Sequence, residues 1–198
     1  MDNPLIKSIF KSQHIHLAGI DPEEDAPIEA TWMTDQAYAE DRISPPARPL
    51  SEHEILIRLQ NEIKAAQDSN SEMLFAYRAN LDDHLVGFLR FHNILWNQRV
   101  GQMKILFGGR EKLERLGREF ISLACTFAFH ELNLHRLTVF YPDYRQTEMD
   151  LFHREGFRDE VRRREAHYYH GKYWDVVHLG LLKSDWNEVR EDRNDGNI

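Results

Sequence analysis

The sequence predicts a single α+β domain, with a mixed and mostly antiparallel sheet of six to seven strands flanked by about four helices. Three observations lead to this fold class. Three short segments of strand character follow one another between residues 73 and 107. An amphipathic helix then ends before a β-branched and aromatic strand at 136–141. A Gly-Phe step at 156–157 opens a long antiparallel hairpin, which closes on Trp186.

The N-terminal elements are marked by alternation and by capping residues. Residues 14–20 (HIHLAGI) alternate as a first strand does, and residues 21–25 (DPEED) have the acids and the proline of a helix start. The proline-rich segment 43–51 is expected to be a loop. Its last residue, Ser51, is a suitable cap for a helix over 52–67.

The central elements are three strands and a second long helix. Residues 73–79 and 85–94 read as strands joined by the acidic turn 81–84, and 101–107 reads as the next strand. The following stretch, 108–117, is expected to be a loop that leads into a helix. That helix is predicted from apolar residues at helical spacing: Phe120, Leu123, Ala124, Phe127 and Ala128.

Length and composition indicate one domain. The chain has 198 residues, of which 41% are hydrophobic and 29% charged, enough to bury a core. We expect an N-terminal extension over 1–13, the domain over 14–186, and a disordered polar tail over 187–198.

The charge and the cysteine content bear on partners and compartment. A net charge of −8 and no basic stripe argue against a nucleic-acid partner and favour a cationic acceptor such as an amine, although the charge can equally serve solubility alone. The single Cys125 excludes an intrachain disulfide. Residues 1–13 resemble no secretory signal, and no apolar run is long enough to span a bilayer. The cytoplasm is therefore expected, with no membrane partner.

The last third of the chain carries a family resemblance. Its ordered landmarks are Phe129, Leu132, Asn133, Leu134, His135, Arg136, Gly156, Phe157, Gly171, Asp175 and Trp186. This pattern resembles the C-terminal half of the GNAT acyltransferases, most closely the branch with the ribosomal-protein N-terminal acetyltransferases. The resemblance implies a GNAT fold over 14–186, acetyl-CoA as co-substrate and an amine as acceptor.

The resemblance also places a loop for the CoA pyrophosphate at 112–117, where a strand, a glycine-containing loop and a helix N-terminus would form an anion site. Only the basic first position and Gly117 match the family pattern. Arg115 stands where relatives have a glycine. It either contacts phosphate together with Lys112 and Arg118, or it is a solvated charge on a loop that no longer binds CoA. The implied cofactor-binding residues are Leu106 and Phe107, through their backbones, and Lys112, Arg115, Leu116, Gly117 and Arg118.

The expected catalytic groups depart from the family too. Relatives carry a tyrosine acid where this chain has Phe152, which has no proton to give. The nearby candidates for the acid are Glu148, Tyr144 and Tyr141, each of which could instead be structural. For the base, the position ten residues past Phe157 is His167, whose side chain suits proton transfer near neutral pH. The alternative is that His167 is an ordinary residue on the hairpin face.

The remaining residues leave several questions open. Eleven histidines form no recognised ligand spacing, so no metal is expected. Trp32 and Trp96 either line an acceptor pocket or fill the core or a dimer contact. The predicted function is acyl-CoA-dependent N-acyl transfer, with acetyl the favoured group, to an amine of a small molecule or a protein N-terminus. The alternative is a catalytically degenerate GNAT-like binding or interaction subunit, and a homodimer is also open.

Overall fold

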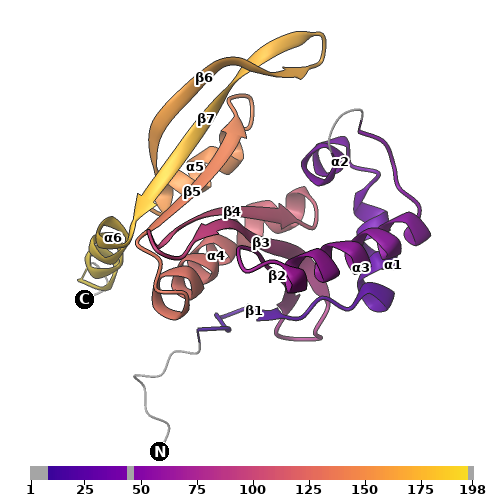
Figure 1. Ribbon diagram of the computed structural model, residues 1–198, viewed down its shortest axis with the longest axis horizontal. Coiled ribbons are helices and arrows are strands. Elements are labelled where there is room, and N and C mark those ends of the chain that lie inside the picture. The colour runs from indigo at the N-terminus through magenta and orange to yellow at the C-terminus, as the bar shows by residue number, and fades with distance from the viewer. Residues whose placement is uncertain (1–8, 44–46, 196–198) are drawn as a thin grey trace, which may run out of the picture.

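The computed structural model describes residues 9–43 and 47–195, and it contains one mixed seven-stranded sheet in the order β1-β2-β3-β4-β5-β7-β6 (Figure 1). The predicted fold class is confirmed, with more helices than expected. The strands are β1 Ile15–Ala18, β2 Met73–Ala79, β3 Leu85–Leu95, β4 Val100–Phe107, β5 Arg136–Pro142, β6 Arg158–Tyr169 and β7 Lys172–Leu182. The helices are α1 Pro22–Trp32, α2 Gln36–Arg42, α3 Glu52–Asp68, α4 Arg110–Thr126, α5 Gln146–Arg154 and α6 Lys183–Asp195, and a π-helical turn at Phe127–Glu131 extends α4.

The two faces of the sheet are covered by different helices. Successive residues of a strand point to opposite faces, and neighbours such as Phe88 and Leu89 belong to separate core clusters. One cluster joins β2–β4 to α1, α2 and α3, and the other joins the sheet to α4 and α5. The predicted cap of α3 is confirmed, since Ser51 and Glu54 form a reciprocal capping box.

The sheet divides between β4 and β5. These two strands pair in parallel over only three positions, Val100–Gln102 with Arg136–Thr138. Beyond that point β5 leaves with β7 and β6, and Figure 1 shows this orange and yellow part diverging from β3 and β4. In the part of the chain that the structure describes, the last five residues of β4 therefore have no strand beside them on the β5 side.

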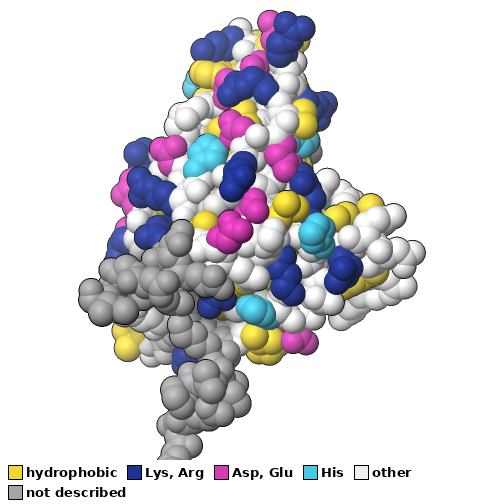
Figure 2. All heavy atoms as spheres, turned by 90° about the vertical axis from the view of Figure 1, so that its left-hand side faces the viewer, with side chains coloured by type: hydrophobic (Ala, Val, Ile, Leu, Met, Phe, Trp, Pro, Cys, Tyr) yellow, Lys and Arg dark blue, Asp and Glu magenta, His cyan; other side chains and the backbone are white. Residues whose placement is uncertain are grey.

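The outer strand of the diverging part is strongly charged. β6 forms one edge of the sheet, and most of its side chains are exposed. Its sequence, RDEVRRREAHYY, mixes both signs of charge, which discourages pairing with another strand edge. Basic and acidic side chains are likewise interspersed over the described part of the face in Figure 2.

The prediction of a loop over 108–117 is wrong. Only Gly108 and Gly109 form a turn, because α4 begins at Arg110. The segment 110–116 (REKLERL) consists of strong helix formers, and it is supported by the i,i+4 ion pairs Arg110–Glu114 and Arg115–Glu111. Gly109 supplies the positive φ of 100° at which the strand turns into the helix.

The C-terminal tail also differs from expectation, and the end of the N-terminal extension packs on the domain. Residues 187–195, predicted to be disordered, continue helix α6, which is held by the buried Trp186 against Phe129 at a ring distance of 5.1 Å. In the extension, the Ser12 hydroxyl donates to Glu119 Oε1 at 2.6 Å, so this part packs on α4. Residues 1–8, 196–198 and the 44–46 part of the predicted proline-rich loop lie outside the described residues.

Candidate active site

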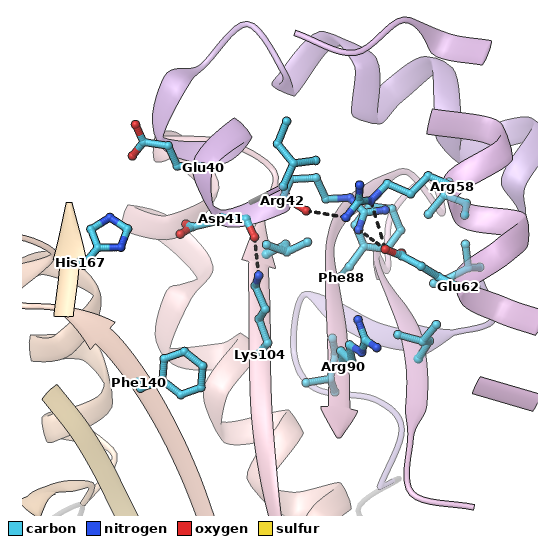
Figure 3. A pocket seen from close by; sticks show the side chains of 16 residues that line it. Glu40, Asp41, Arg42, Arg58, Glu62, Phe88, Arg90, Lys104, Phe140 and His167 are labelled. Atoms are coloured by element: carbon cyan, nitrogen blue, oxygen red, sulfur yellow. Dashed lines mark hydrogen bonds and ion pairs between the residues drawn. The ribbon is translucent and has the colours of Figure 1, made fainter. Parts of the chain in front are cut away.

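Three adjoining cavities meet around Asp41, at the C-terminal end of α2. The turn cavity, about 290 Å³, lies beside the β4–α4 turn and includes Phe107, Gly109 and Arg110. The cleft cavity, about 300 Å³, lies where β4 and β5 part. The floor cavity, about 410 Å³, lies between α2, α3 and the face of β2–β4 (Figure 3). Asp41 lines all three, so they adjoin at this residue, and we refer to them together as the depression.

Tyr144 and His167 stand where these cavities join. Tyr144 lines the turn and cleft cavities, and His167 lines the cleft and floor cavities. The Tyr144 hydroxyl lies 3.3 Å from His167 Nε2 and 3.5 Å from Glu40 Oε2. Two of the three predicted catalytic residues are therefore brought into hydrogen-bonding distance from separate elements.

The Tyr144 ring is fixed by aromatic neighbours. It stacks on Tyr169 at 4.7 Å between centroids and meets the edge of Trp174 at 5.0 Å. Burial, followed by the charge of Glu40, raises the pKa of Tyr144 to about 12. The hydroxyl therefore keeps its proton at neutral pH and can act as a hydrogen-bond donor.

His167 reaches the cleft because of a β-bulge. Arg163 pairs with Val176, but the next pair is His167 with Trp174, so three β6 residues face the single Asp175 of β7. The bulge contains Glu165 in a left-handed conformation, with φ of 51°, and its N–H donates to Asp175 Oδ1 at 3.0 Å. That hydrogen bond and, next, Arg162 lower the pKa of Asp175. Bulges of this kind redirect side chains beside functional sites.

Glu148 lies in the depression but is held in an ion pair. Its carboxylate is 2.8 Å from Arg145 Nη1, and Arg145 Nη2 is 2.9 Å from Asp41 Oδ2. Glu148 is buried and lines the turn cavity. Glu148 is thus engaged by Arg145, whereas the Tyr144 hydroxyl faces His167, so the geometry favours Tyr144 over Glu148 as the acid.

Asp41 is a site residue that sequence reasoning missed. Burial raises its pKa to about 6, against the opposing effects of Arg145 and Lys104. A carboxyl group that titrates near neutrality inside a cleft is a frequent mark of a functional position. Its surroundings in the sequence, QAYAEDR, form a short polar helix with no recognisable motif, so no local signal could have identified it.

The residues expected at the pyrophosphate loop are dispersed along α4. Lys112, Arg115 and Leu116 line a different groove, together with the β2–β3 turn. Arg118 Nε pairs with the buried Glu155 at 3.1 Å. A Cβ on Gly117 would lie 2.6 Å from Leu151 Cδ1, so this glycine serves the close packing of α4 on α5. The residues of this region that line the turn cavity are instead Gly109, Arg110 and Leu113.

Only alternate residues of β4 direct their backbone N–H and C=O groups toward the gap beside β5. Gly108 N–H donates to Val86 O on β3. Because backbone groups alternate in direction along a strand, Leu106 also faces β3, whereas Ile105 and Phe107 face the gap beside β5. Of the two residues expected to offer backbone groups, Phe107 is therefore suitably directed and Leu106 is not.

The other aromatic candidates have structural surroundings. Phe152 is buried between Tyr141 and Phe157, at ring distances of 5.5 and 5.1 Å. Trp32 packs on Tyr38 and Phe88 and against the Gly108 turn, where a Cβ would lie 2.5 Å from its ring. Trp96 is exposed, and its indole N–H donates to Asn70 O.

Comparison with known proteins identifies relatives of this fold. The domain described as "Acetyltransferase (GNAT) domain" matches residues 23–178. The Bacillus subtilis (strain 168) protein named "Putative ribosomal N-acetyltransferase YdaF" is 29% identical over 109 residues, which are 53% of this chain and 57% of that protein. The chain thus matches little more than half the length of this curated relative.

Solved structures share the architecture. Spermidine N-acetyltransferase from Vibrio cholerae, in complex with CoA and spermine, aligns with a TM-score of 0.73 at 18% identity, over 87% of this chain and 98% of that one. The acetyltransferase (GNAT family) from Bacillus anthracis aligns with a TM-score of 0.71 at 15% identity, over 88% and 98% of the two chains. At these identities the likeness is one of fold. Within the described residues, no helix has the length and apolar character needed to cross a membrane.

Proposed function

This chain belongs to the GNAT acetyltransferase family, and from that premise we propose that it transfers an acetyl group from acetyl-CoA to an amine. The acceptor would be an amine of a small molecule or of a protein N-terminus. Its place would be the cytoplasm, in keeping with a single cysteine that is buried in the core.

The observation that carries the proposal is the junction of cavities at Tyr144 and His167. A two-substrate transfer needs two binding spaces that meet at a proton donor and a proton acceptor. The turn cavity reaches the junction from the β4–α4 turn, and the floor cavity reaches it from beneath α2 and α3. The 3.3 Å contact of Tyr144 with His167 lies between them.

The turn cavity fits the acyl-CoA side. Among the described residues no side chain caps the N-terminus of α4, so its first-turn N–H groups and the positive end of its dipole are available to phosphate. Arg110 adds a cation at this end. The backbones of Phe107 and Ile105 face the gap between β4 and β5, where a pantetheine amide could pair with them.

The chemistry asks little more of the protein than positioning and two proton transfers. The amine nitrogen forms a bond to the thioester carbonyl carbon, and the bond from that carbon to sulfur breaks. His167 takes the proton that the amine loses, and the Tyr144 hydroxyl donates toward the departing sulfur. Asp41, with its raised pKa, is the second candidate for the base.

One observation favours the alternative of a binding or interaction subunit. Helix α4 occupies 110–117, where the family pattern expects a phosphate loop. If the shortened Gly108-Gly109 turn cannot hold CoA, the depression would serve binding alone. Affinity for CoA therefore discriminates between the two functions.

The test is a set of thermal unfolding measurements with CoA, acetyl-CoA, succinyl-CoA and longer acyl-CoAs. A ligand at a hundred to a thousand times its dissociation constant should stabilise the fold by about 2.7 to 4.1 kcal/mol. Stabilisation by acetyl-CoA supports the proposal, and preference for a longer chain would change the acyl group. No shift with any of them supports the interaction subunit instead.

A further inference from the structure

The floor cavity carries two cations that lie directly opposite one another on neighbouring strands. Arg90 on β3 and Lys104 on β4 are register partners, and both side chains line this cavity (Figure 3). His92 follows Arg90 on the same face and lines the adjoining cleft cavity. Like charges directly opposite one another on neighbouring strands destabilise a sheet.

These cations are incompletely neutralised by the protein. Arg90 Nη2 pairs with Glu72 at 2.6 Å, but the buried Arg90 Nε has no hydrogen-bond partner among the described residues. Lys104 Nζ donates to the backbone carbonyl of Asp41, not to a carboxylate. Burial lowers the pKa of Lys104 and of His92, although the charges of Asp41 and Glu72 oppose these shifts, so their charged forms are only partly compensated.

The other cations of the floor cavity are already paired. Glu62 accepts from Arg42 at 2.8 Å and from Arg58 at 3.2 Å, and Arg42 also binds Glu29. Arg58 donates in addition to Arg42 O. This ion-pair network forms one side wall and leaves the Arg90–Lys104 pair as the basic group of the floor.

The opposite end of the cavity is acidic. Glu40 lies there beside His167 and the Tyr144 hydroxyl, as Figure 3 shows for Glu40 and His167. An ammonium group is stabilised next to Glu40, and an anion is stabilised at Arg90 and Lys104. The cavity is thus acidic at one end and basic at the other, a charge distribution complementary to that of a zwitterion.

From this distribution we infer that the acceptor amine carries its own anionic group, a carboxylate or a phosphate, which binds Arg90 and Lys104 while the amine lies at Glu40 and His167. The inference rests on the proposed function and specifies its substrate class. It also excludes a plain polyamine as the preferred acceptor, because a polycation would place positive charge on the two floor cations.

The test compares matched amines as acceptors for acetyl-CoA. Alanine and leucine are each paired with their amides, O-phosphoethanolamine is paired with ethanolamine, and spermidine is added. Release of the CoA thiol gives kcat/KM for each. One charge-assisted hydrogen bond corresponds to about a 10- to 100-fold preference for the anionic member of a pair. The amino-acid pairs report a carboxylate, and the ethanolamine pair reports a phosphate.

Substitutions of Arg90 and Lys104 test whether the preference for the anionic amine depends on these two residues of the floor cavity. Arg90→Gln and Lys104→Gln should each reduce the ratio of kcat/KM within a pair at least about tenfold, whereas Arg90→Lys should retain part of the preference. Lys64→Gln, which removes an exposed charge on α3 outside the cavities, is the control. Persistence of the preference in both Gln variants would overturn the inference, as would a preference for neutral amines or spermidine.

A binding measurement covers the case in which no amine of this set is acetylated. Sodium acetate and inorganic phosphate, at ionic strength matched with sodium chloride, should then raise the melting temperature of the wild-type protein more than that of Arg90→Gln. Equal shifts in the two proteins contradict the inference. Acetyl-CoA binding, titrated separately, tests the proposed function, so the two can fail independently.

Discussion

The Tyr144 hydroxyl lies 3.3 Å from His167 Nε2, although one residue precedes α5 and the other lies in β6. The contact joins the cavity beside the α4 N-terminus to the cavity beneath α2 and α3. It places a proton donor and a proton acceptor together between the two cavities that we propose hold the substrates.

The first prediction concerns the donor. Tyr144→Phe keeps the aromatic stacking but removes the hydroxyl, so kcat should fall by about 10²-fold while acetyl-CoA affinity stays within twofold. A thiolate is a good leaving group, which places the effect at the lower end of acid catalysis. Steady-state kinetics and calorimetric titration measure the two quantities. Tyr168→Phe, an exposed tyrosine of the same strand as His167, is the control; an equal loss in both variants would refute the role of Tyr144.

The second prediction concerns the bulge that directs His167. Asp175→Ala removes the acceptor of the Glu165 N–H. We expect kcat to fall by about 10- to 100-fold, because small misplacements of a reacting group are costly. The KM for acetyl-CoA should not change. Asp175→Asn retains Oδ1 as an acceptor and should keep most of the activity. If Ala and Asn behave alike, the hydrogen bond does not position His167.

The third prediction compares two arginines of α4. Arg110 lines the turn cavity and Arg115 a different groove, and each forms one exposed i,i+4 ion pair. Arg110→Ala should weaken acetyl-CoA binding about fivefold, the equivalent of roughly 1 kcal/mol for an exposed charge contact. The loss should shrink at high salt. Arg115→Ala should bind normally. The reverse order in calorimetric titrations would restore the phosphate site first expected at 112–117.

The fourth prediction concerns pH. Burial raises the pKa of Asp41 from 3.8 to about 6. The folded state therefore holds this proton more tightly than the unfolded state, and the resulting stabilisation is complete below about pH 3.8 and lost as pH rises through about 6. Asp41→Asn is neutral throughout. The melting temperature of the wild type, relative to this variant, should fall between pH 4 and 7.

The control for Asp41 is Asp150→Asn, on the exposed side of α5. The melting temperature of this variant should change with pH in the same way as that of the wild type over the same pH range. Parallel behaviour of Asp41→Asn as well would show that Asp41 titrates in the folded protein as it does in the unfolded chain.

The sequence predicted most of the fold because its elements are encoded locally. Ser51 and Glu54 define the start of α3, and the alternation of 73–79 and 85–94 defines two central strands. The error at 108–117 came from placing a family loop on residues that are strong helix formers. The glycine-glycine step before them was the better local signal for the turn.

The candidate site was predicted only in part, because it depends on distant contacts. Tyr144 and His167 were selected for their chemistry, but their proximity follows from a three-residue bulge that strand propensity does not report. The role of Asp41 arises from its burial, and the roles of Arg90 and Lys104 arise from their pairing across strands. Neither is visible in the neighbouring sequence.

The most direct test of the account measures amine-dependent release of the CoA thiol from acetyl-CoA by the wild type and by the double variant Tyr144→Phe/His167→Gln. The account predicts release by the wild type that depends on the amine, and a rate about 10²- to 10⁴-fold lower in a double variant that still binds acetyl-CoA. A wild type that binds acetyl-CoA but releases no thiol with any amine, or a double variant with the full rate, would contradict it.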